Sequence, residues 1–344
     1  MVLELTRPVV QAPMAGGPST PALAAAVSEA GGLGFLAAGY RTPEAVRDDV
    51  RAVRGMTGAR VGVNVFLPGP RADDEAVRRY AAELRAEADR WGVELGDPRY
   101  DDDDAWEAKV AVCVEERVPV VSFTFGLPRP DVVATLHDAG ALVLVTVTTP
   151  EEAVAARDVG ADALVVQGVE AGGHRGGFRD DDGAGEYGLL ALLRLVARAA
   201  DLPMVAAGGL VDGPSVAAVL VAGAEAAQLG TAFLACPEAG TSPAHREALT
   251  AVGATALTRA FSGRRARGLV NRFLTEHSAA APSAYPQVHH LTTPLRAAAR
   301  AAGDAGGVNM WAGQAHRLVE PLPAGELVRR LDDDARAALA RVRR

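Results

Sequence analysis

The residue of this sequence best placed to do chemistry is a histidine inside a glycine-rich loop. The loop reads QGVEAGGHRGG over residues 167–177, carries His174, and follows directly on the apolar run ALVVQ at 163–167. An imidazole whose ordinary pKa lies near neutrality can donate or accept a proton at physiological pH. A lone histidine is more often structural, but a glycine-flanked loop after a strand is a common place for a catalytic side chain. The position therefore favours an active-site role.

Two other glycine-containing stretches have the character of an anion site. They are AAGG at 206–209 and QLGT at 228–231, and both end short apolar runs. Glycine lets backbone N–H groups approach an anion because it has no Cβ, and Thr231 adds a hydroxyl. Each stretch alone is more often a simple turn. If the two runs are the seventh and eighth strands of a barrel, the pair coincides with the usual phosphate site of that fold.

Other candidate motifs are weaker. The dinucleotide fingerprint G-x-G-x-x-G occurs at 183–188, but it follows RDDD rather than a strand, so we interpret it as a chance match in a loop. No metal site is expected, because His289 and His290 are adjacent and cannot share one face of a helix, and the acidic runs at 101–104, 180–182 and 332–334 lack the spacing of a ligand loop.

The elements that would position these loops alternate between strands and helices. Thr-Pro pairs at 20–21, 42–43 and 149–150 are typical of helix starts, with a capping hydroxyl before a proline in the first turn. Eight strands alternating with helices predict a (β/α)8 TIM barrel, with a doubly wound sheet as the competing architecture. The runs read as buried parallel strands are 8–14, 34–39, 61–67, 118–125, 141–147, 163–167, 203–208 and 226–230.

Two regions are longer than the single strand and single helix that each repeating unit of a barrel requires. Residues 68–117 form an acidic, helical insertion, which we expect to lie as solvated helices on the outside of the barrel. Residues 232–322 are expected to form a smaller, mainly helical cap or substrate domain over the barrel mouth. The barrel itself is then predicted to comprise residues 1–231 and 323–344, with the last helix returning to the barrel wall.

The composition argues against nucleic acid as a partner of this protein. The chain has 344 residues, 35 Lys and Arg against 43 Asp and Glu, and a formal net charge of -8, so it lacks the basic footprint of a nucleic-acid-binding protein. No targeting segment and no run of 18 apolar residues is present, and the two cysteines are too few for a disulfide framework. We expect a cytoplasmic protein, monomeric or homodimeric, that acts on a small molecule.

The sequence resembles the nitronate monooxygenase family, formerly called 2-nitropropane dioxygenases, which are FMN enzymes on a (β/α)8 barrel. The matching stretches run in order through nearly the whole chain, and SFTFG with WAGQ resembles the bacterial class I branch. They are QAPMAGG at 11–17, VNVF at 63–66, SFTFG at 122–126, QGVEAGGHRGG at 167–177, AAGG at 206–209, QLGT at 228–231 and WAGQ at 311–314.

The resemblance implies specific roles. His174 is expected to be the catalytic imidazole beside the flavin, Ala12 to Met14 to line the flavin ring, and Gly209 with Gln228 to Thr231 to hold the phosphate. Tyr285, His289 and His290 lie in the cap region, where they either reach the pocket or serve as ordinary packing residues. The full set expected to bind the cofactor is Ala12, Pro13, Met14, Asn64, Gln167, Gly172, Gly173, Gly208, Gly209, Gln228, Leu229, Gly230, Thr231, Trp311, Gly313 and Gln314.

The activity implied is the oxidation of alkyl nitronates, such as propionate 3-nitronate, by O2 to a carbonyl compound and nitrite. FMN would accept electrons, and His174 would either donate a hydrogen bond to the nitro group or take the α-proton of a neutral nitroalkane. The alternative within the same superfamily is an NAD(P)H-dependent FMN reductase of the quinone reductase or enoyl-ACP reductase type, because EAGGH and the phosphate glycines look similar there. A flavin- or phosphate-binding protein without turnover is the other alternative.

Overall fold

Eight parallel strands close into a barrel in a computed structural model of the chain, which describes residues 2–180, 186–251 and 253–342. The barrel closes where the backbone N–H of Gln11 donates to Leu33 O at 2.9 Å and that of Leu33 donates to Val9 O at 3.0 Å. The TIM-barrel prediction and all eight predicted strands are thus confirmed. In hydrogen-bonding order the strands are β1 (Val9–Gln11), β9 (Ala226–Leu229), β8 (Met204–Ala207), β6 (Ala163–Gln167), β5 (Leu142–Val147), β4 (Val120–Thr124), β3 (Val61–Phe66) and β2 (Gly34–Ala37).

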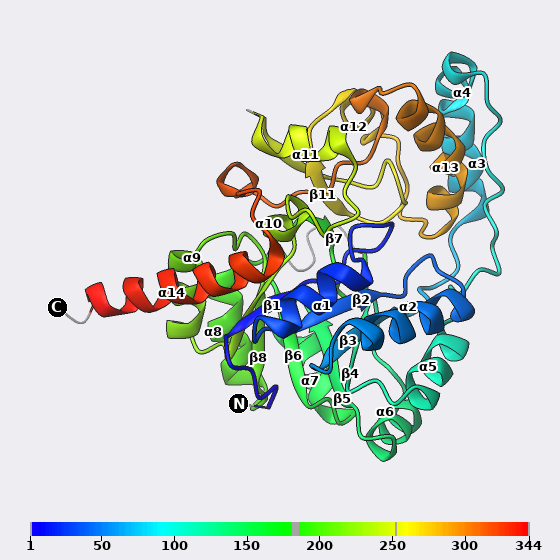
Figure 1. Cartoon of the computed structure of the whole chain (residues 1–344). Helices are drawn as coiled ribbons and strands as arrows, with labels where there is room; N and C mark the ends of the chain where they lie inside the picture. The colour runs from blue at the N-terminus through cyan, green and yellow to red at the C-terminus, as the bar shows by residue number, and fades with distance from the viewer. Residues whose placement is uncertain (1, 181–185, 252, 343–344) are drawn as a thin grey trace.

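Helices surround this barrel (Figure 1). The hydroxyls of Thr20, Thr42 and Thr149 accept hydrogen bonds from the third residue of the helix that follows each, at 3.0 to 3.2 Å, as the Thr-Pro pairs predict. The surrounding helices are α1 (Pro21–Glu29), α2 (Pro43–Met56), α5 (Trp106–Glu115), α6 (Pro130–Asp138), α7 (Pro150–Asp158), α8 (Leu189–Ala199), α9 (Gly213–Val221) and α14 (Ala324–Val342), the last of which packs on α1 and α9.

Apolar side chains fill the inside of the barrel. They come from strands all around it and form one cluster that includes Val10, Phe35, Val120, Leu144, Val165 and Val205. A Cβ on Gly62 would lie 2.3 Å from the ring of Phe35, so the barrel is packed rather than open. The inside of the barrel therefore leaves no room for a ligand between the strands.

Only part of the helical insertion lies on the outside of the barrel as expected: α5 packs on the barrel wall, whereas for the two helices before it the expectation was wrong. Helices α3 (Asp74–Glu83) and α4 (Arg85–Trp91) bury an apolar stripe that includes Tyr80 and Leu84, and they pack against α13 (Gln287–Ala301). The Tyr80 hydroxyl donates to Ala260 O at 2.7 Å. The charged residues that suggested a solvated segment occupy only the opposite face of these amphipathic helices.

The region after the barrel strands contains helices and a small sheet. The helices are α10 (Thr231–Leu234), α11 (Pro243–Thr250), α12 (Arg272–His277), α13 and two short 3-10 turns, η1 (Ala305–Gly307) and η2 (His316–Leu318). The strands β10 (Thr255–Thr258) and β11 (Ala266–Leu269) pair with each other in antiparallel fashion, and β11 also pairs with β7 (Gly173–His174), which belongs to the loop after β6. The glycine-rich loop is thereby hydrogen-bonded to the cap region. The division into a barrel and a cap domain stays a prediction.

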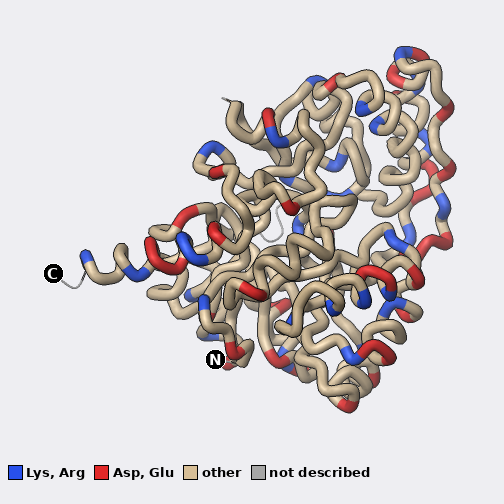
Figure 2. Tube along the Cα trace, viewed as in Figure 1, with Lys and Arg blue, Asp and Glu red and all other residues tan. Residues whose placement is uncertain are grey.

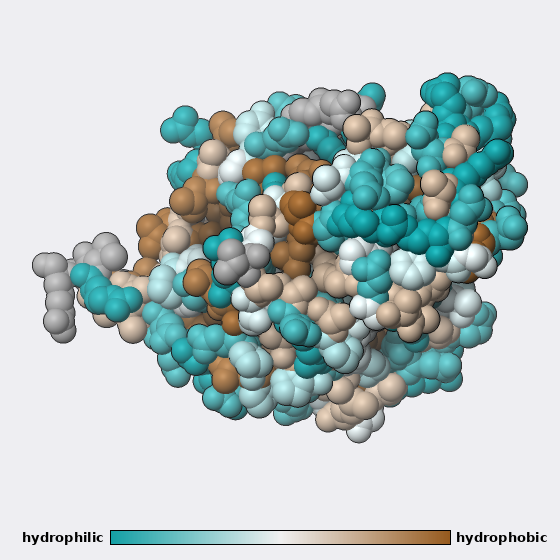
Figure 3. All heavy atoms as spheres, turned by 90° about the horizontal axis from the view of Figure 1, so that it is seen from above, coloured by the Kyte–Doolittle hydropathy of each residue, from teal (hydrophilic) through white to brown (hydrophobic). Residues whose placement is uncertain are grey.

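The surface mixes charges of both signs, with Lys and Arg interspersed among Asp and Glu along the outer helices (Figure 2). From above, apolar residues gather near the centre and left of the molecule, whereas the right side, where α3 and α4 lie, is hydrophilic (Figure 3).

Over the described part of the chain, no helix has the length and apolarity needed to cross a membrane. The cytoplasmic location and the monomeric or homodimeric state stay predictions. Residues 183–185 of the fingerprint-like GAGEYG lie outside the described residues.

Candidate active site

A cavity of about 730 Å³ lies at the carboxyl ends of the barrel strands, between the barrel and the cap region. Two residues expected at the cofactor do not line it: Leu229 is 1% exposed and packs in the core, and Gln314 is exposed, with its backbone N–H donating to Glu170 O at 3.1 Å. The other expected residues all line it, namely Ala12, Pro13, Met14, Asn64, Gln167, Gly172, Gly173, His174, Gly208, Gly209, Gln228, Gly230, Thr231, Trp311 and Gly313.

Close packing shapes the loop that carries His174. A Cβ on Gly172 would lie 2.5 Å from the backbone N of Gly313, so only glycine fits there. The side-chain amide of Gln167 donates to His174 O at 3.0 Å and accepts from the backbone N–H of Gly176 and from the Arg175 guanidinium, each at 2.9 Å. Gln167 therefore holds the backbone of His174 in place from the end of β6.

The His174 side chain lies among aromatic rings. Its ring centroid is 5.6 Å from those of Phe125 and Trp311 and 5.8 Å from that of Tyr285, and its Nε2 is 2.9 Å from Ser262 Oγ. Burial, together with the nearby cation of Arg264, lowers the pKa of His174 to about 3. The imidazole is thus neutral at physiological pH.

The predicted anion loops lie next to one another because β8 and β9 are neighbouring strands. Gly208 and Gly209 have backbone φ angles of +122° and +69°, which residues with a side chain rarely adopt, and both line the cavity. In the second loop, the Thr231 hydroxyl accepts from the backbone N–H of Gly313 at 3.0 Å and keeps its own proton free to donate. The two loops offer uncharged donors on one wall of the cavity.

Asn64 presents an acceptor on the barrel side of the same cavity. Its Nδ2 donates to Ser122 Oγ at 2.8 Å and Thr124 Oγ1 at 2.9 Å, and it lies at the end of β3. Those bonds orient the amide, and Oδ1 has no hydrogen-bond partner among the residues that the structure describes. The oxygen is available to a donor in the cavity.

Sequence reasoning missed a cation in the cavity wall. Arg296 on α13 donates to His289 O at 2.8 Å, Thr293 Oγ1 at 2.9 Å and Thr292 Oγ1 at 3.1 Å, and it forms no ion pair with a carboxylate of the described residues. Burial lowers its pKa to about 10, so it stays charged at neutral pH. Its position seven residues after His289 on one helix places both on the same face, a signal that the sequence contained.

Aromatic residues at strand ends were also missed. Tyr40, Phe66 and Phe125 follow or end β2, β3 and β4 and line the cavity, where the Tyr40 ring stacks on His289 with centroids 4.1 Å apart. The general rule that chemistry gathers at the carboxyl ends of barrel strands would have identified them. Of the cap residues left open, His289 lines the cavity, whereas His290 Nε2 pairs with Asp102 Oδ2 at 2.6 Å.

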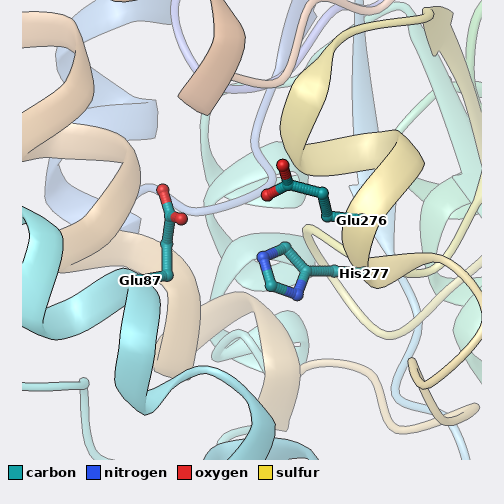
Figure 4. Close-up of side chains that lie close together, drawn as sticks. All are labelled: Glu87, Glu276 and His277. Atoms are coloured by element: carbon teal, nitrogen blue, oxygen red, sulfur yellow. The ribbon is translucent and has the colours of Figure 1, made fainter.

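One group outside the cavity has the spacing of metal ligands. Glu87, Glu276 and His277 lie close together between α4 and α12 (Figure 4). Arg272 donates to both oxygens of Glu87, at 2.6 and 2.8 Å, and to Glu276 at 2.8 Å. The guanidinium already supplies the positive charge that these carboxylates require, so we assign the group to an ion-pair network that joins α4 to α12.

The fold and the cavity define the class of protein as a TIM-barrel enzyme that works on a small molecule at the carboxyl ends of its strands. The family model for nitronate monooxygenase matches residues 2–334. A nitronate monooxygenase of Paraburkholderia phytofirmans is 42% identical over 99% of this chain and 96% of its own length.

Two solved structures share the fold of this chain. The nitroalkane oxidase from Streptomyces ansochromogenes is 54% identical, covers 99% of each chain and superposes with a TM-score of 0.96. FabK from Thermotoga maritima is 29% identical, with a TM-score of 0.76 over 99% of this chain and 96% of its own. The chain belongs to the nitronate monooxygenase family and is an oxidoreductase.

Proposed function

We propose that this protein is an FMN-dependent nitronate monooxygenase, which oxidises alkyl nitronates with O2 to a carbonyl compound and nitrite. The observation that carries the proposal is the neutral His174 on the wall of one cavity that also contains the paired glycine loops after β8 and β9. Membership of the nitronate monooxygenase family and the similarity to a nitroalkane oxidase support it.

The cavity fits a flavin mononucleotide in size and in donor set. Its volume lies within the range of about 300–1,000 Å³ that is usual for cofactor and ligand sites. The backbone at Gly208, Gly209 and Gly230 can approach a phosphate, with the Thr231 hydroxyl as a further donor. A Cβ on Gly173 would project into open space, which leaves room for a ring at this point. FMN, when bound, supplies the electron acceptor that the reaction needs.

Residues of the chain would then bind and orient the substrate. Arg296 places a positive charge on the cavity wall, and a partly desolvated cation attracts an anionic nitronate strongly. Phe66, Phe125 and Trp311 surround the site with apolar rings that exclude water. Because His174 is neutral, it does not add a second fixed charge and is free to take part in a hydrogen bond or a proton transfer.

The cation also bears on which nitronate is used. Arg296 keeps N–H donors available for a ligand. Its hydrogen bonds go to a carbonyl and two hydroxyls, and its contacts with His289 Nδ1 at 3.3 Å and Asn309 Oδ1 at 3.4 Å are weaker. A nitronate with a carboxylate at its other end, such as propionate 3-nitronate, has an anionic group for this guanidinium in addition to the reacting one. We propose such carboxylated nitronates as the preferred substrates.

Absorbance measurements on the purified protein test the function. We expect a yellow protein that releases FMN on denaturation, bleaches when a nitronate is added without oxygen, and recovers its colour with release of nitrite when oxygen is admitted. His174→Ala is expected to keep FMN and lose about 100-fold or more in kcat/KM, within the range of a lost general acid or base. Rapid bleaching by NADH, without a response to nitronates, would contradict the proposal and favour an NAD(P)H-dependent reductase.

A further inference from the structure

A buried serine contacts the imidazole of His174. Ser262 lies in the turn between β10 and β11, is 2% exposed, and lines the cavity. Its Oγ is 2.9 Å from His174 Nε2 and 3.2 Å from the backbone oxygen of Arg264. Nothing in the family resemblance assigns a role to this serine, and its position in the cap region could not be read from the barrel pattern.

The two contacts together determine where the protons lie. A serine hydroxyl has a single proton to donate, and a backbone carbonyl can only accept. Donation from Ser262 to Arg264 O satisfies that carbonyl, for which the described residues offer no other donor. The serine oxygen then accepts from His174, which requires the proton of the imidazole to be on Nε2. The opposite arrangement leaves a buried carbonyl unpaired, which costs about 1–3 kcal/mol.

The other ring nitrogen is left as an acceptor. His174 Nδ1 has no hydrogen-bond partner among the described residues, yet this atom is not fully buried. It therefore borders open space, and the space that His174 borders is the cavity. With the proton on Nε2, Nδ1 carries an unshared electron pair.

We propose that Ser262 is a positioning residue that holds His174 in the Nε2–H tautomer, so that the lone pair of Nδ1 faces the substrate. A donor role of His174 toward the nitro oxygens does not fit this arrangement, because a bare nitrogen repels them. Of the two roles considered for His174, the geometry favours proton acceptance. Neutral nitroalkanes thereby become substrates as well as nitronates, a consequence that rests on the proposed function.

The proton transfer is balanced within the cavity. The α-proton of a neutral nitroalkane moves to His174 Nδ1, the C–H electron pair becomes the second bond of C=N, and the negative charge passes to the nitro oxygens. The product pair is an imidazolium beside a nitronate, and the nitronate is also attracted by Arg296. Once the nitronate has formed, its negative charge stabilises the imidazolium and raises the pKa of His174. This offsets the lowering of that pKa by burial.

Nuclear magnetic resonance of the holoenzyme with 15N-labelled histidine tests the tautomer directly. Wild type should show His174 protonated at Nε2 and bare at Nδ1, with the signal identified by its loss in His174→Gln. Ser262→Thr, which keeps the hydroxyl, should preserve this state, whereas Ser262→Ala should yield a mixture or the Nδ1–H form. Protonation at Nδ1 in wild type, or an unchanged tautomer in Ser262→Ala, would overturn the proposal. This measurement needs no turnover, so it stands even if the proposed function fails.

Kinetics with two matched substrates supply the second readout. Ser262→Ala is expected to lower kcat/KM about 10- to 100-fold for a neutral nitroalkane and much less for its preformed nitronate, since only the first needs a base. Ser262→Thr should restore most of the loss. Ser278→Ala, a half-buried cap serine bonded to Leu274 O and away from the cavity, serves as the control. Equal losses on both substrates would overturn the role in proton acceptance.

Discussion

Arg296 gives the cavity its charge, and its effect can be separated from that of the rest of the site. Arg296→Met should raise KM about 10- to 100-fold for a nitronate with a terminal carboxylate, because a charge-assisted hydrogen bond contributes about 1.5–3 kcal/mol. An alkyl nitronate of similar length without the carboxylate should be affected less. Steady-state kinetics with the two substrates measures the difference.

Arg300 provides a matched control for this prediction. It lies one helical turn further along α13 and also lines the cavity, but its side chain is exposed to solvent. Arg300→Met should change KM little for either substrate, because solvent screens an exposed charge. Equal effects of Arg296→Met on both nitronates would mean that the guanidinium attracts the nitro group rather than a carboxylate.

At the scale of elements, the loop after β6 depends on close backbone contact with the WAGQ segment. Gly172→Ala would place a methyl group 2.5 Å from Gly313 N and 2.6 Å from the carbonyl carbon of Ala312, where only backbone is present to give way. We expect a loss of about 1–3 kcal/mol in the free energy of unfolding and weaker FMN retention. Gly69 lies in an exposed loop, where an added Cβ would have no atom within 4 Å. Gly69→Ala is therefore the control and should leave the free energy of unfolding unchanged. Equal stability of the two variants in urea unfolding would contradict the packing argument.

Asp104, at the end of the acidic run at 101–104, makes a structural connection, whereas Asp101 and Asp103 are exposed. Asp104 Oδ1 accepts from the backbone N–H of Tyr40 at 3.0 Å and pairs with Lys109 Nζ at 2.7 Å, and Lys109 is fully buried. Since Tyr40 stacks on His289, the hydrogen bond from Tyr40 to Asp104 joins the insertion to the cavity wall, and the ion pair with Lys109 holds Asp104 in place.

Removing the charge of Asp104 should therefore destabilise the protein. Asp104→Asn leaves the Lys109 ammonium buried without a counter-charge, and we expect a loss of about 3–5 kcal/mol in the free energy of unfolding. Asp101→Asn, at an exposed position in the same run, should have almost no effect. Thermal unfolding followed by circular dichroism measures both. A small effect of Asp104→Asn would mean that solvent reaches Lys109.

The sequence identified the barrel well because its signals are local. The β-branched runs, the Thr-Pro helix starts and the glycines at strand ends each act within a few residues, and so the loops with His174, Gly208 and Gly230 were found. Ser262 was missed for the opposite reason. Its place in the cavity depends on how the β10–β11 hairpin packs with α3, α4 and α13, and these contacts join segments about 180 residues apart.

At the scale of the whole molecule, three histidines lie where the barrel meets the cap. His174 is on the loop after β6, His245 on α11 has its Nε2 3.1 Å from Trp311 O, and His289 on α13 stacks on Tyr40. Burial lowers the pKa of His245 to about 4 and, together with the Arg296 cation, that of His289 to about 2, in the same direction as for His174. All three imidazoles are neutral in the folded chain at pH 5 and above.

This arrangement predicts that mild acid weakens the fold. The unfolded chain binds a proton at each histidine near pH 6.5, whereas the folded chain does not do so until about pH 4 or below. As the pH falls from 6.5 to 5, protons therefore bind preferentially to the unfolded state, and each of the three histidines removes about 2 kcal/mol from the free energy of unfolding. Urea unfolding of the holoenzyme at pH 7.5, 6.5 and 5 measures the fall.

One of these histidines can be removed to test the cause. His245→Gln keeps a side-chain N–H for Trp311 O but has no proton to bind, so the fall between pH 6.5 and 5 should shrink by about 2 kcal/mol relative to wild type. Buried carboxylates do not account for such a difference, because the substitution leaves every one of them in place. A variant with the same pH dependence as wild type would mean that His245 takes up its proton without unfolding, which requires the contact between α11 and Trp311 to open in the folded state.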